Sequence, residues 1–391
     1  MALQPASGAK DLNPKQVETN HLLVEKITQV FRLWGYEEVA PPRVERLATL
    51  MAGGAISNED IVKIVSDDSL GLRPEMTASI ARAACTRFAN RPRPLRLFAT
   101  GTVFESRETA EEGTSIEENL QCGVELLGAK GINAEMELLT LLLEAMERIG
   151  VTKDQEPTLL IGDTSLMRLI LSELDSTLQE KAKNHLINYD VLALRELELD
   201  NSLSQKLLSL HQCRGKPSVV LNELEDLLGK SQELTNIRRL FSIIEPLASS
   251  HGIEIQLDPT FQPHFELYTG IVFQLICKGI SAPVVISRGG RYDDLVQHFG
   301  ARGTQAAGLG FSFAIDRIRE LLIESIDEDA LNQKIIITYS KDSNIEEALK
   351  RQNYWHKKGQ IAQVELEPYE NEQKANLLKE EINATKVEWL N

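Results

Sequence analysis

The sequence is poor in cysteine and has no long apolar run, and these two absences exclude several classes of protein. Its four cysteines lie at least 37 residues apart without a CxxC pair, which argues against a zinc knuckle or redox pair and favours reduced thiols. No apolar run approaches the ~20 residues of a membrane helix, and the N-terminal residues lack a signal-peptide hydrophobic region. We therefore expect a cytoplasmic protein with no bound metal or cofactor and no membrane association.

Basic residues are outnumbered by acidic ones. The chain has 42 Lys and Arg against 58 Asp and Glu, a formal net charge of −16. This balance argues against broad electrostatic attraction to nucleic acid or to an anionic membrane. The length of 391 residues and the hydrophobic fraction of 42% suggest two or three domains with a sizeable core.

Runs of strands set apart from helices predict an α+β fold with an antiparallel sheet. Asn13 followed by Pro14 is typical of a helix start, and Gly35 of a helix end. The segments 95–103 and 119–127 should form strands that flank a polar loop. The other predicted elements of this part are helices over 15–34 and 134–149, strands over 36–41, 253–257, 269–277 and 282–287, and a helix that begins near residue 310.

Composition suggests three parts. The segment 163–247 is leucine-rich and almost wholly helical, which predicts an all-α insertion that interrupts a discontinuous core of residues 1–162 and 248–325. Residues 326–391 read as a small, truncated α/β unit. Its predicted elements are strands over 334–339, 361–366 and 386–390 and helices over 344–358 and 371–382.

Several short motifs occur in a fixed order between residue 8 and about residue 325. They are GAKDLNP (8–14), LRPEMT (72–77), QCGVE (121–125), YTG (268–270), GGRYD (289–293) and GLGFSFAIDR (308–317). In this order they resemble the histidyl-tRNA synthetase catalytic domain and its paralogue, the ATP phosphoribosyltransferase regulatory subunit. The resemblance implies a class II aminoacyl-tRNA synthetase-like antiparallel sheet flanked by helices.

The resemblance also implies a histidine pocket. Glu75, Thr77, Gln121 and Glu125 would meet the α-amino end of histidine through charge-assisted hydrogen bonds, and Tyr268 and Tyr292 would frame the imidazole. Gln121 and Glu125 would share one strand face, because alternate residues of a strand point the same way. Taken singly, Glu75 could instead be an exposed carboxylate at a helix start and Tyr292 a turn-packing aromatic.

The phosphate side departs from the synthetase pattern. Glu105 stands where the synthetases carry a phosphate-binding arginine, and the basic residue follows at Arg107, so an exchanged pair could close a salt bridge. Pro263 stands where the synthetases carry a mobile catalytic arginine, and His264 reads as a half-exposed loop histidine rather than its substitute. The run Glu105, Glu108, Glu111, Glu112, Glu117 and Glu118 reads as a solvated acidic loop without a phosphate grip.

Two further features have open interpretations. Arg317 matches the arginine of the third synthetase motif and could bind an anion, or merely pair with Asp316 or Asp293. The pair Gly289–Gly290 could form a tight turn or allow a ligand to approach the backbone closely.

The resemblance and these departures favour a non-catalytic regulatory subunit of ATP phosphoribosyltransferase, with no catalytic residues of its own. Such a chain would serve the first step of histidine biosynthesis, mediate feedback by histidine and assemble with the short catalytic subunit, at least as a homodimer and without tRNA. The alternatives are an active histidyl-tRNA synthetase and a free-standing histidine-sensing module.

Overall fold

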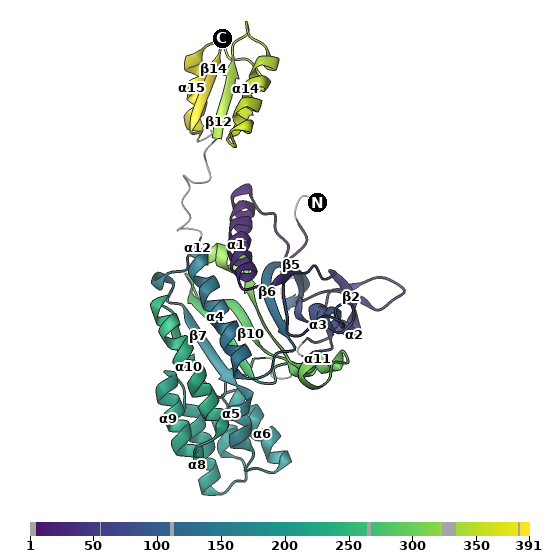
Figure 1. Cartoon of the computed structure of the whole chain (residues 1–391), viewed down its shortest axis with the longest axis vertical. Helices are drawn as coiled ribbons and strands as arrows, with labels where there is room; N and C mark the ends of the chain where they lie inside the picture. The colour runs from purple at the N-terminus through teal and green to yellow at the C-terminus, as the bar shows by residue number, and fades with distance from the viewer. Residues whose placement is uncertain (1–4, 55, 110–112, 264–266, 323–333, 382–383) are drawn as a thin grey trace. The chain divides into compact units, whose positions relative to one another are not determined.

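The chain divides into two compact units, Met1–Leu321 and Leu322–Asn391, whose elements are shown in Figure 1. The computed structural model describes residues 5–54, 56–109, 113–263, 267–322, 334–381 and 384–391. Every predicted site residue belongs to the first unit.

The first unit is built on an eight-stranded sheet. In spatial order its strands are β1 (Glu37–Glu38), β5 (Leu95–Thr109), β6 (Gly113–Leu127), β11 (Gly308–Ala314), β10 (Pro283–Arg291), β9 (Ile271–Lys278), β7 (Thr158–Asp163) and β8 (Glu254–Leu257). Neighbours from β5 to β7 are antiparallel, and the edge pairs β1–β5 and β7–β8 are parallel. The predicted α+β class with a mainly antiparallel sheet is confirmed.

Helices α1 (Pro14–Leu33) and α4 (Ile132–Ile149) pack against each other and against one face of this sheet. The predicted start of α1 is confirmed, because Asn13 and Gln16 form a reciprocal capping box and Pro14 opens the helix. Phe31 anchors α1 to the sheet, with its ring centroid 5.8 Å from that of Phe98 and 5.9 Å from that of Phe311.

The opposite face of the sheet carries α3 (Thr77–Cys85) and α11 (Asp293–His298). Ile80 of α3, Leu97 of β5 and Leu295 of α11 belong to one buried apolar cluster. Beside it lie α2 (Leu47–Leu50) and a small sheet of β2 (Val44–Arg46), β4 (Leu70–Leu72) and β3 (Lys63–Ile64).

Between β7 and β8 the chain is helical, as the leucine pattern predicts. The helices are α5 (Thr164–Leu171), α6 (Ser176–Ile187), α7 (Val191–Arg195), α8 (Asn201–Gln212), α9 (Pro217–Leu228) and α10 (Gln232–Ser250). Side chains of Asp163, Asp175, Asp190, Asp200 and Ser231 cap α5, α6, α7, α8 and α10. The five N-caps show why one stretch makes several short helices instead of a long one.

The second unit is a three-stranded parallel sheet in the order β13-β12-β14. Its elements are β12 (Lys334–Tyr339), α14 (Ile345–Lys357), β13 (Ile361–Val364), α15 (Glu372–Glu381) and β14 (Lys386–Leu390). This alternation of strand and helix confirms the elements predicted there. Ile337, Ala348 and Val364 form its core.

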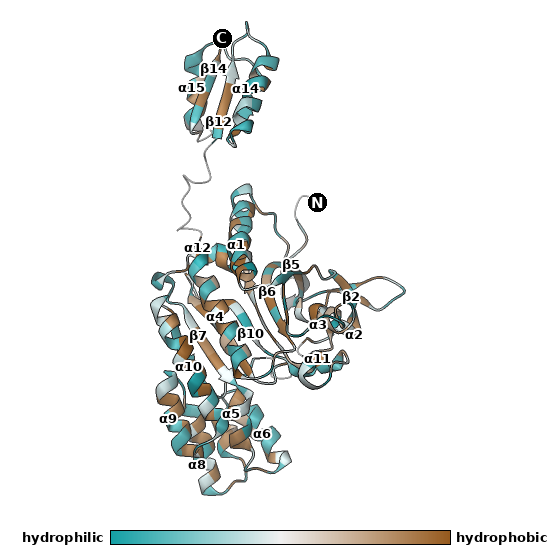
Figure 2. Ribbon diagram, viewed as in Figure 1, coloured by the Kyte–Doolittle hydropathy of each residue, from teal (hydrophilic) through white to brown (hydrophobic). Residues whose placement is uncertain are grey.

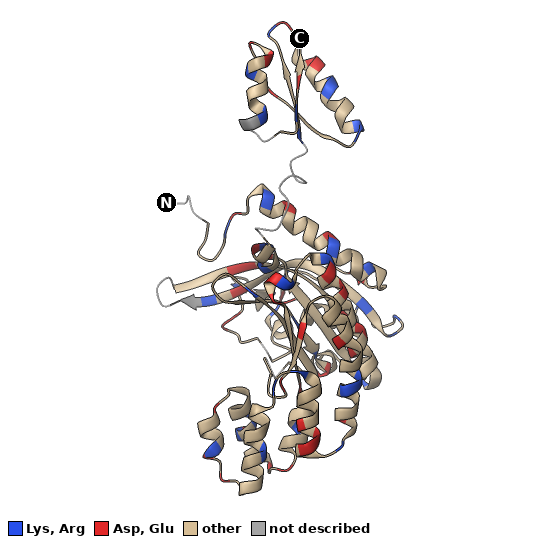
Figure 3. Ribbon diagram, turned by 90° about the vertical axis from the view of Figure 1, so that its left-hand side faces the viewer, with Lys and Arg blue, Asp and Glu red and all other residues tan. Residues whose placement is uncertain are grey.

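Apolar and charged residues are distributed as burial requires. Strand β7, which has neighbours on both sides, is apolar along most of its length (Figure 2). Acidic and basic residues are interspersed on the helices (Figure 3). Within the described residues, none of the helices combines the length and the hydropathy that crossing a membrane requires.

The β5–β6 hairpin is longer than predicted. Both strands are 15 residues long, and their pairing runs from Leu95 opposite Leu127 to Thr109 opposite Gly113. Glu105, Glu108, Glu117 and Glu118 of the predicted acidic loop therefore lie in strands, because backbone pairing continues through these polar residues. Conversely, the strand expected over 36–41 shortens to β1, where Pro41 and Pro42 follow and cannot donate backbone hydrogen bonds.

The helix predicted to begin near residue 310 is wrong. Residues Gly308–Ala314 form β11, which pairs with β6 on one side and β10 on the other, and α12 (Ile315–Leu322) begins only after it. Glycine is uncommon in strands, so Gly308 and Gly310 made this run look unlike a strand in the sequence. In the structure each of these glycines lies against a bulky side chain. A Cβ on Gly308 would lie 2.4 Å from the Tyr292 ring, so this strand needs glycine there.

Leu142→Ala is expected to destabilise the first unit by ~2–5 kcal/mol, because Leu142 on α4 is fully buried and its truncation leaves a cavity. The matched control is Leu192→Ala on α7, where the side chain is 74% exposed. That control should change the unfolding free energy by less than ~0.5 kcal/mol. Urea denaturation followed by circular dichroism checks both values, and equal losses for the two variants would contradict the packing described here.

Candidate functional site

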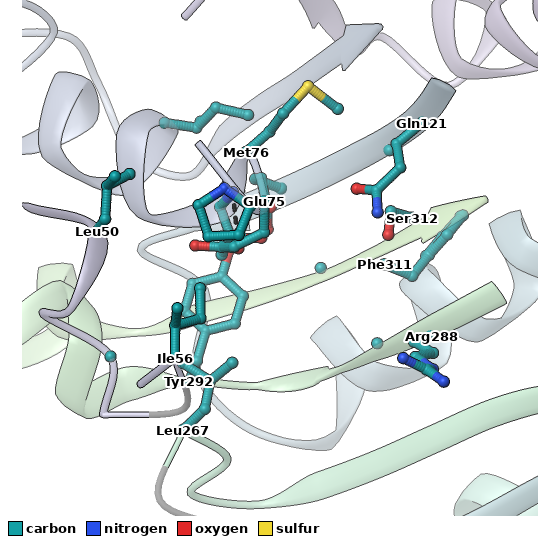
Figure 4. Close-up of a pocket in the computed structure, with 18 of the residues that line it drawn as sticks. Leu50, Ile56, Glu75, Met76, Gln121, Leu267, Arg288, Tyr292, Phe311 and Ser312 are labelled. Atoms are coloured by element: carbon teal, nitrogen blue, oxygen red, sulfur yellow. Dashed lines mark hydrogen bonds between the residues drawn. The ribbon is translucent and has the colours of Figure 1, made fainter. Parts of the chain in front are cut away.

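A cavity of about 330 Å³ lies on the face of the sheet that carries α3 and α11. Strands β6, β11 and β10 form its floor, and the start of α3 forms one wall. Figure 4 shows Glu75 and Tyr292 on one side of this cavity and Gln121, Ser312 and Arg288 on the other. Leu50, Ile56 and Leu267 add apolar surface.

Two positions in the strands that form the floor require glycine, because bulky groups lie directly over them. Gly310 pairs with Glu125 across the β6–β11 ladder, and a Cβ there would lie 1.9 Å from Glu125 Oε2. A Cβ on Gly290 would lie 2.5 Å from the Tyr268 ring. The interpretation of Gly289–Gly290 as a turn is wrong, since both residues lie inside β10.

The carboxyl of Glu125 is a buried polar group of the cavity, and this residue is 5% exposed. It accepts a hydrogen bond from the hydroxyl of Tyr292, which is itself buried. Burial raises the pKa of Glu125 to about 8, although hydrogen bonds from Tyr292 and Thr77 oppose the shift. The same burial raises the pKa of Tyr292. The oxygens of Glu125 and Tyr292 can therefore accept hydrogen bonds from a ligand, and this pair favours the binding of a cation.

Glu75 caps the start of α3 and also lines the cavity, where it is partly buried and not exposed. Its carboxylate accepts hydrogen bonds from the backbone amides of Thr77 at 3.0 Å and Ala78 at 2.9 Å, so it stabilises the first turn of α3. It also lines the cavity, where burial raises its pKa. The helix start thus fixes the direction of a carboxylate that faces the same space as Glu125.

The structure brings the predicted histidine-binding residues together. Glu75, Thr77, Gln121, Glu125, Tyr268 and Tyr292 all line this one cavity. Gln121 and Glu125 lie on the same face of β6, as the alternation of strand residues predicts. Tyr268 packs over the backbone of β10 at Gly290, and burial raises the pKa of its hydroxyl.

Arg317 lies outside this cavity, in an adjoining pocket of about 50 Å³ that shares Arg288 with it. Its guanidinium donates a hydrogen bond to the backbone carbonyl of Val285 at 3.3 Å. The two aspartates proposed as its partners are engaged elsewhere: Asp316 with Arg319 at 2.5 Å, and Asp293 with Arg291 at 3.3 Å.

Arg288 is a cavity residue that the sequence reasoning missed. It lies on β10 opposite Ser312 of β11, and both residues line the cavity. The signal was present, because residues 288, 290 and 292 alternate onto one face of an extended chain. Following this alternation back from Tyr292 would have added Arg288 to the predicted pocket.

The exchanged acidic and basic residues form the predicted salt bridge. Arg107 contacts Glu105 at 3.3 Å and also Glu117 on the neighbouring strand at 3.3 Å. Glu105 and Arg107 both line the cavity, so a carboxylate stands where the resemblance places a phosphate-binding arginine. Glu111, Glu112 and His264 lie outside the described residues.

The cavity is suited to binding a ligand with charges at both ends. Carboxylates of Glu75 and Glu125 gather on one side, and the guanidinium of Arg288 lies on the other. In the part of the chain that the structure describes, no group of three or more His, Cys, Asp or Glu residues could hold a metal ion.

Comparison with known proteins shows the family. Residues 8–318 match a family model described as histidyl-tRNA synthetase. Over 391 residues the chain is 56% identical to the ATP phosphoribosyltransferase regulatory subunit of Prochlorococcus marinus (strain MIT 9303), with 100% of both chains covered. It is 53% identical over 390 residues to that of Synechococcus sp. (strain CC9902), again with 100% of both covered. The chain belongs to the ATP phosphoribosyltransferase regulatory subunit family.

Solved structures share the fold of this regulatory-subunit family. An ATP phosphoribosyltransferase regulatory subunit/histidyl-tRNA synthetase from Bacillus halodurans superposes with a TM-score of 0.82 at 23% identity, over 100% of this chain and 99% of that one. Histidyl-tRNA synthetase from Nostoc sp. PCC 7120 gives 0.78 at 17% identity, over 97% and 90%. The class II aminoacyl-tRNA synthetase-like architecture is thereby confirmed.

Glu125→Gln is expected to remove a pH-dependent loss of stability. In the folded chain this carboxyl keeps its proton up to about pH 8, whereas its ordinary pKa is 4.5. Between these values the folded state binds more protons than the unfolded state. The unfolding free energy of the wild type therefore falls as the pH rises, by up to about 1.4 kcal/mol per pH unit relative to the variant.

Urea denaturation across this pH range, without ligand, measures the difference. Glu18→Gln, which removes the same charge from the exposed side of α1, is the control and should follow the wild-type profile. Parallel profiles for the wild type and Glu125→Gln would contradict the assignment of a buried, proton-retaining carboxyl.

Proposed function

We propose that this chain is a non-catalytic regulatory subunit of ATP phosphoribosyltransferase that binds histidine in the cavity around Glu125. The observation that carries the proposal is the convergence of Glu75, Thr77, Gln121, Glu125, Tyr268 and Tyr292 on one cavity. Its volume of about 330 Å³ suits a small molecule, since such sites span ~300–1,000 Å³.

The chemistry of the cavity supports a cationic, aromatic-sized ligand. Histidine offers an ammonium and an imidazole, and both can donate hydrogen bonds to carboxylates. Glu75 and Glu125 are fixed acceptors, held by backbone amides and by the Tyr292 hydroxyl respectively. The tyrosine rings beside them supply a flat, partly dry surface for an imidazole.

Two positions that supply phosphate-facing cations in the resembling synthetases carry no cation in this chain. Glu105 and Pro263 occupy the two positions where the resembling synthetases carry phosphate-facing arginines. A carboxylate and a phosphate oxygen at ~4 Å repel each other by about 4 kcal/mol at an effective dielectric of 20, where an arginine would attract by a similar amount. Losing such a preplaced donor lowers rates by ~10²–10³. This supports binding without chemistry.

The names of the curated relatives support a partnership with the catalytic subunit of ATP phosphoribosyltransferase, which would carry out the first step of histidine biosynthesis. We propose that the assembly contains the short catalytic chain, that this chain is at least a homodimer, and that it acts in the cytoplasm without tRNA. The net charge of −16 supports the last point. Histidine bound here would then report the supply of the end product.

Reconstitution tests the function. The protein is mixed with the short catalytic chain, ATP and phosphoribosyl pyrophosphate, and ATP-dependent release of pyrophosphate is measured with increasing histidine. We expect activity only in the mixture and a response to histidine. Glu125→Gln should weaken histidine binding about tenfold to hundredfold, because it removes a charge-assisted contact, and should shift the response to higher concentration.

Glu18→Gln is the matched control and should leave both the calorimetric titration and the response curve unchanged. A response curve that stays in place when Glu125→Gln has lost histidine binding would place the sensor on the catalytic chain instead.

The isolated protein is expected to show no histidine-dependent exchange of labelled pyrophosphate into ATP above background. Pro263→Arg alone should not restore exchange, since Glu105 still faces the phosphate. A preparation that activates the catalytic chain serves as the positive control for folding. Exchange activity that copurifies with such a preparation would show a working synthetase and overturn this part of the proposal.

A further inference from the structure

Arg288 is a cation of the cavity whose charge has no partner among the residues that the structure describes. Among the described residues, its guanidinium makes no hydrogen bond and no ion pair, in contrast to Arg107, which contacts Glu105 and Glu117 at 3.3 Å each. Arg288 nevertheless lines both the main cavity and the adjoining small pocket, and it is accessible to solvent through them.

The charges around Arg288 favour an anion there. Burial is the main cause that lowers the pKa of Arg288, and repulsion from Arg317 and Arg107 adds to it, while Glu105 acts in the opposite direction. Because Glu105 is already paired with Arg107, it does not neutralise the group. A bound anion would relieve the repulsion among the arginines.

Arg288 lies where it could contact the negatively charged end of a zwitterionic ligand whose positively charged end meets Glu125. The sheet register sets Glu125 opposite Gly310, and Gly310 opposite Gly290; the row two residues along runs from Gly123 through Ser312 to Arg288. Two residues of strand span ~7 Å. Glu125 and Arg288 therefore face the same cavity from adjacent rows of the sheet. The glycines in these rows have no side chains that would fill the space between the two groups.

We propose that Arg288 binds the α-carboxylate of the amino acid held by Glu75 and Glu125, so that it is a specificity-determining residue for a free amino acid. This inference rests on the proposed function. Unlike the mobile arginine that the resembling synthetases carry at the position of Pro263, this cation lies on a strand of the sheet. A guanidinium suits this task because its fork matches a carboxylate.

The test compares L-histidine with L-histidinol, in which a hydroxymethyl group replaces the carboxylate while the ammonium and imidazole remain. Both are titrated calorimetrically into the full-length wild type, Arg288→Gln and Arg107→Gln. The wild type should prefer histidine at least tenfold. Arg288→Gln should lose this preference through weaker histidine binding, with histidinol binding as in the wild type.

Binding of histidinol doubles as the folding check for each variant. Arg107→Gln is the matched control from the same cavity and should keep the preference, because Arg107 is committed to two carboxylates. The inference is overturned if Arg288→Gln keeps the preference, if it loses histidinol binding as well, or if Arg107→Gln loses the preference instead. Failure of the wild type to bind histidine at all would overturn the proposed function together with the inference.

Discussion

A carboxyl buried on a central strand is the constraint on which the site depends. Glu125 lies on β6, in the middle of the sheet, and its carboxyl occupies the space above Gly310 of the next strand. Burial of an acid without a full cationic partner costs free energy, and the raised pKa is the expression of that cost. The hydroxyl of Tyr292 donates a hydrogen bond to this carboxyl, and the glycines of β11 leave room for the Glu125 and Tyr292 side chains. Packing alone would not favour these residues at these positions.

The charged groups of the cavity suit the binding of an amino acid better than the formation of an adenylate, because the two tasks need different charges. Adenylate chemistry needs cations fixed against phosphates, whereas recognition of a small amino acid needs acceptors for its cationic groups and one cation for its carboxylate. In this chain the acceptors are Glu75 and Glu125, and Arg107 forms ion pairs with Glu105 and Glu117. Under the proposed function, this sheet would hold one ligand, and binding of that ligand would be coupled to the interaction with a partner chain.

Several elements were predictable because their cause is local. The capping pair Asn13–Pro14 defined the start of α1, and the strands and helices of residues 334–390 followed from their alternation of hydrophobic patterns. The helix expected near residue 310 failed for the opposite reason. The glycines of β11 are there for the neighbours above them, Glu125 and Tyr292, which lie far away in sequence.

The sequence by itself determined the family, the α+β class and six residues that line one cavity, because short motifs at matching positions carry that information without coordinates. Only the tertiary structure decided which charges are free to meet a ligand. The register of β5 with β6 brings Glu117 to Arg107, which also contacts Glu105 on its own strand, whereas the register of β10 with β11 leaves Arg288 facing the cavity. Electrostatic partners are set by distances of a few ångströms across strands, and the linear sequence does not encode those distances directly.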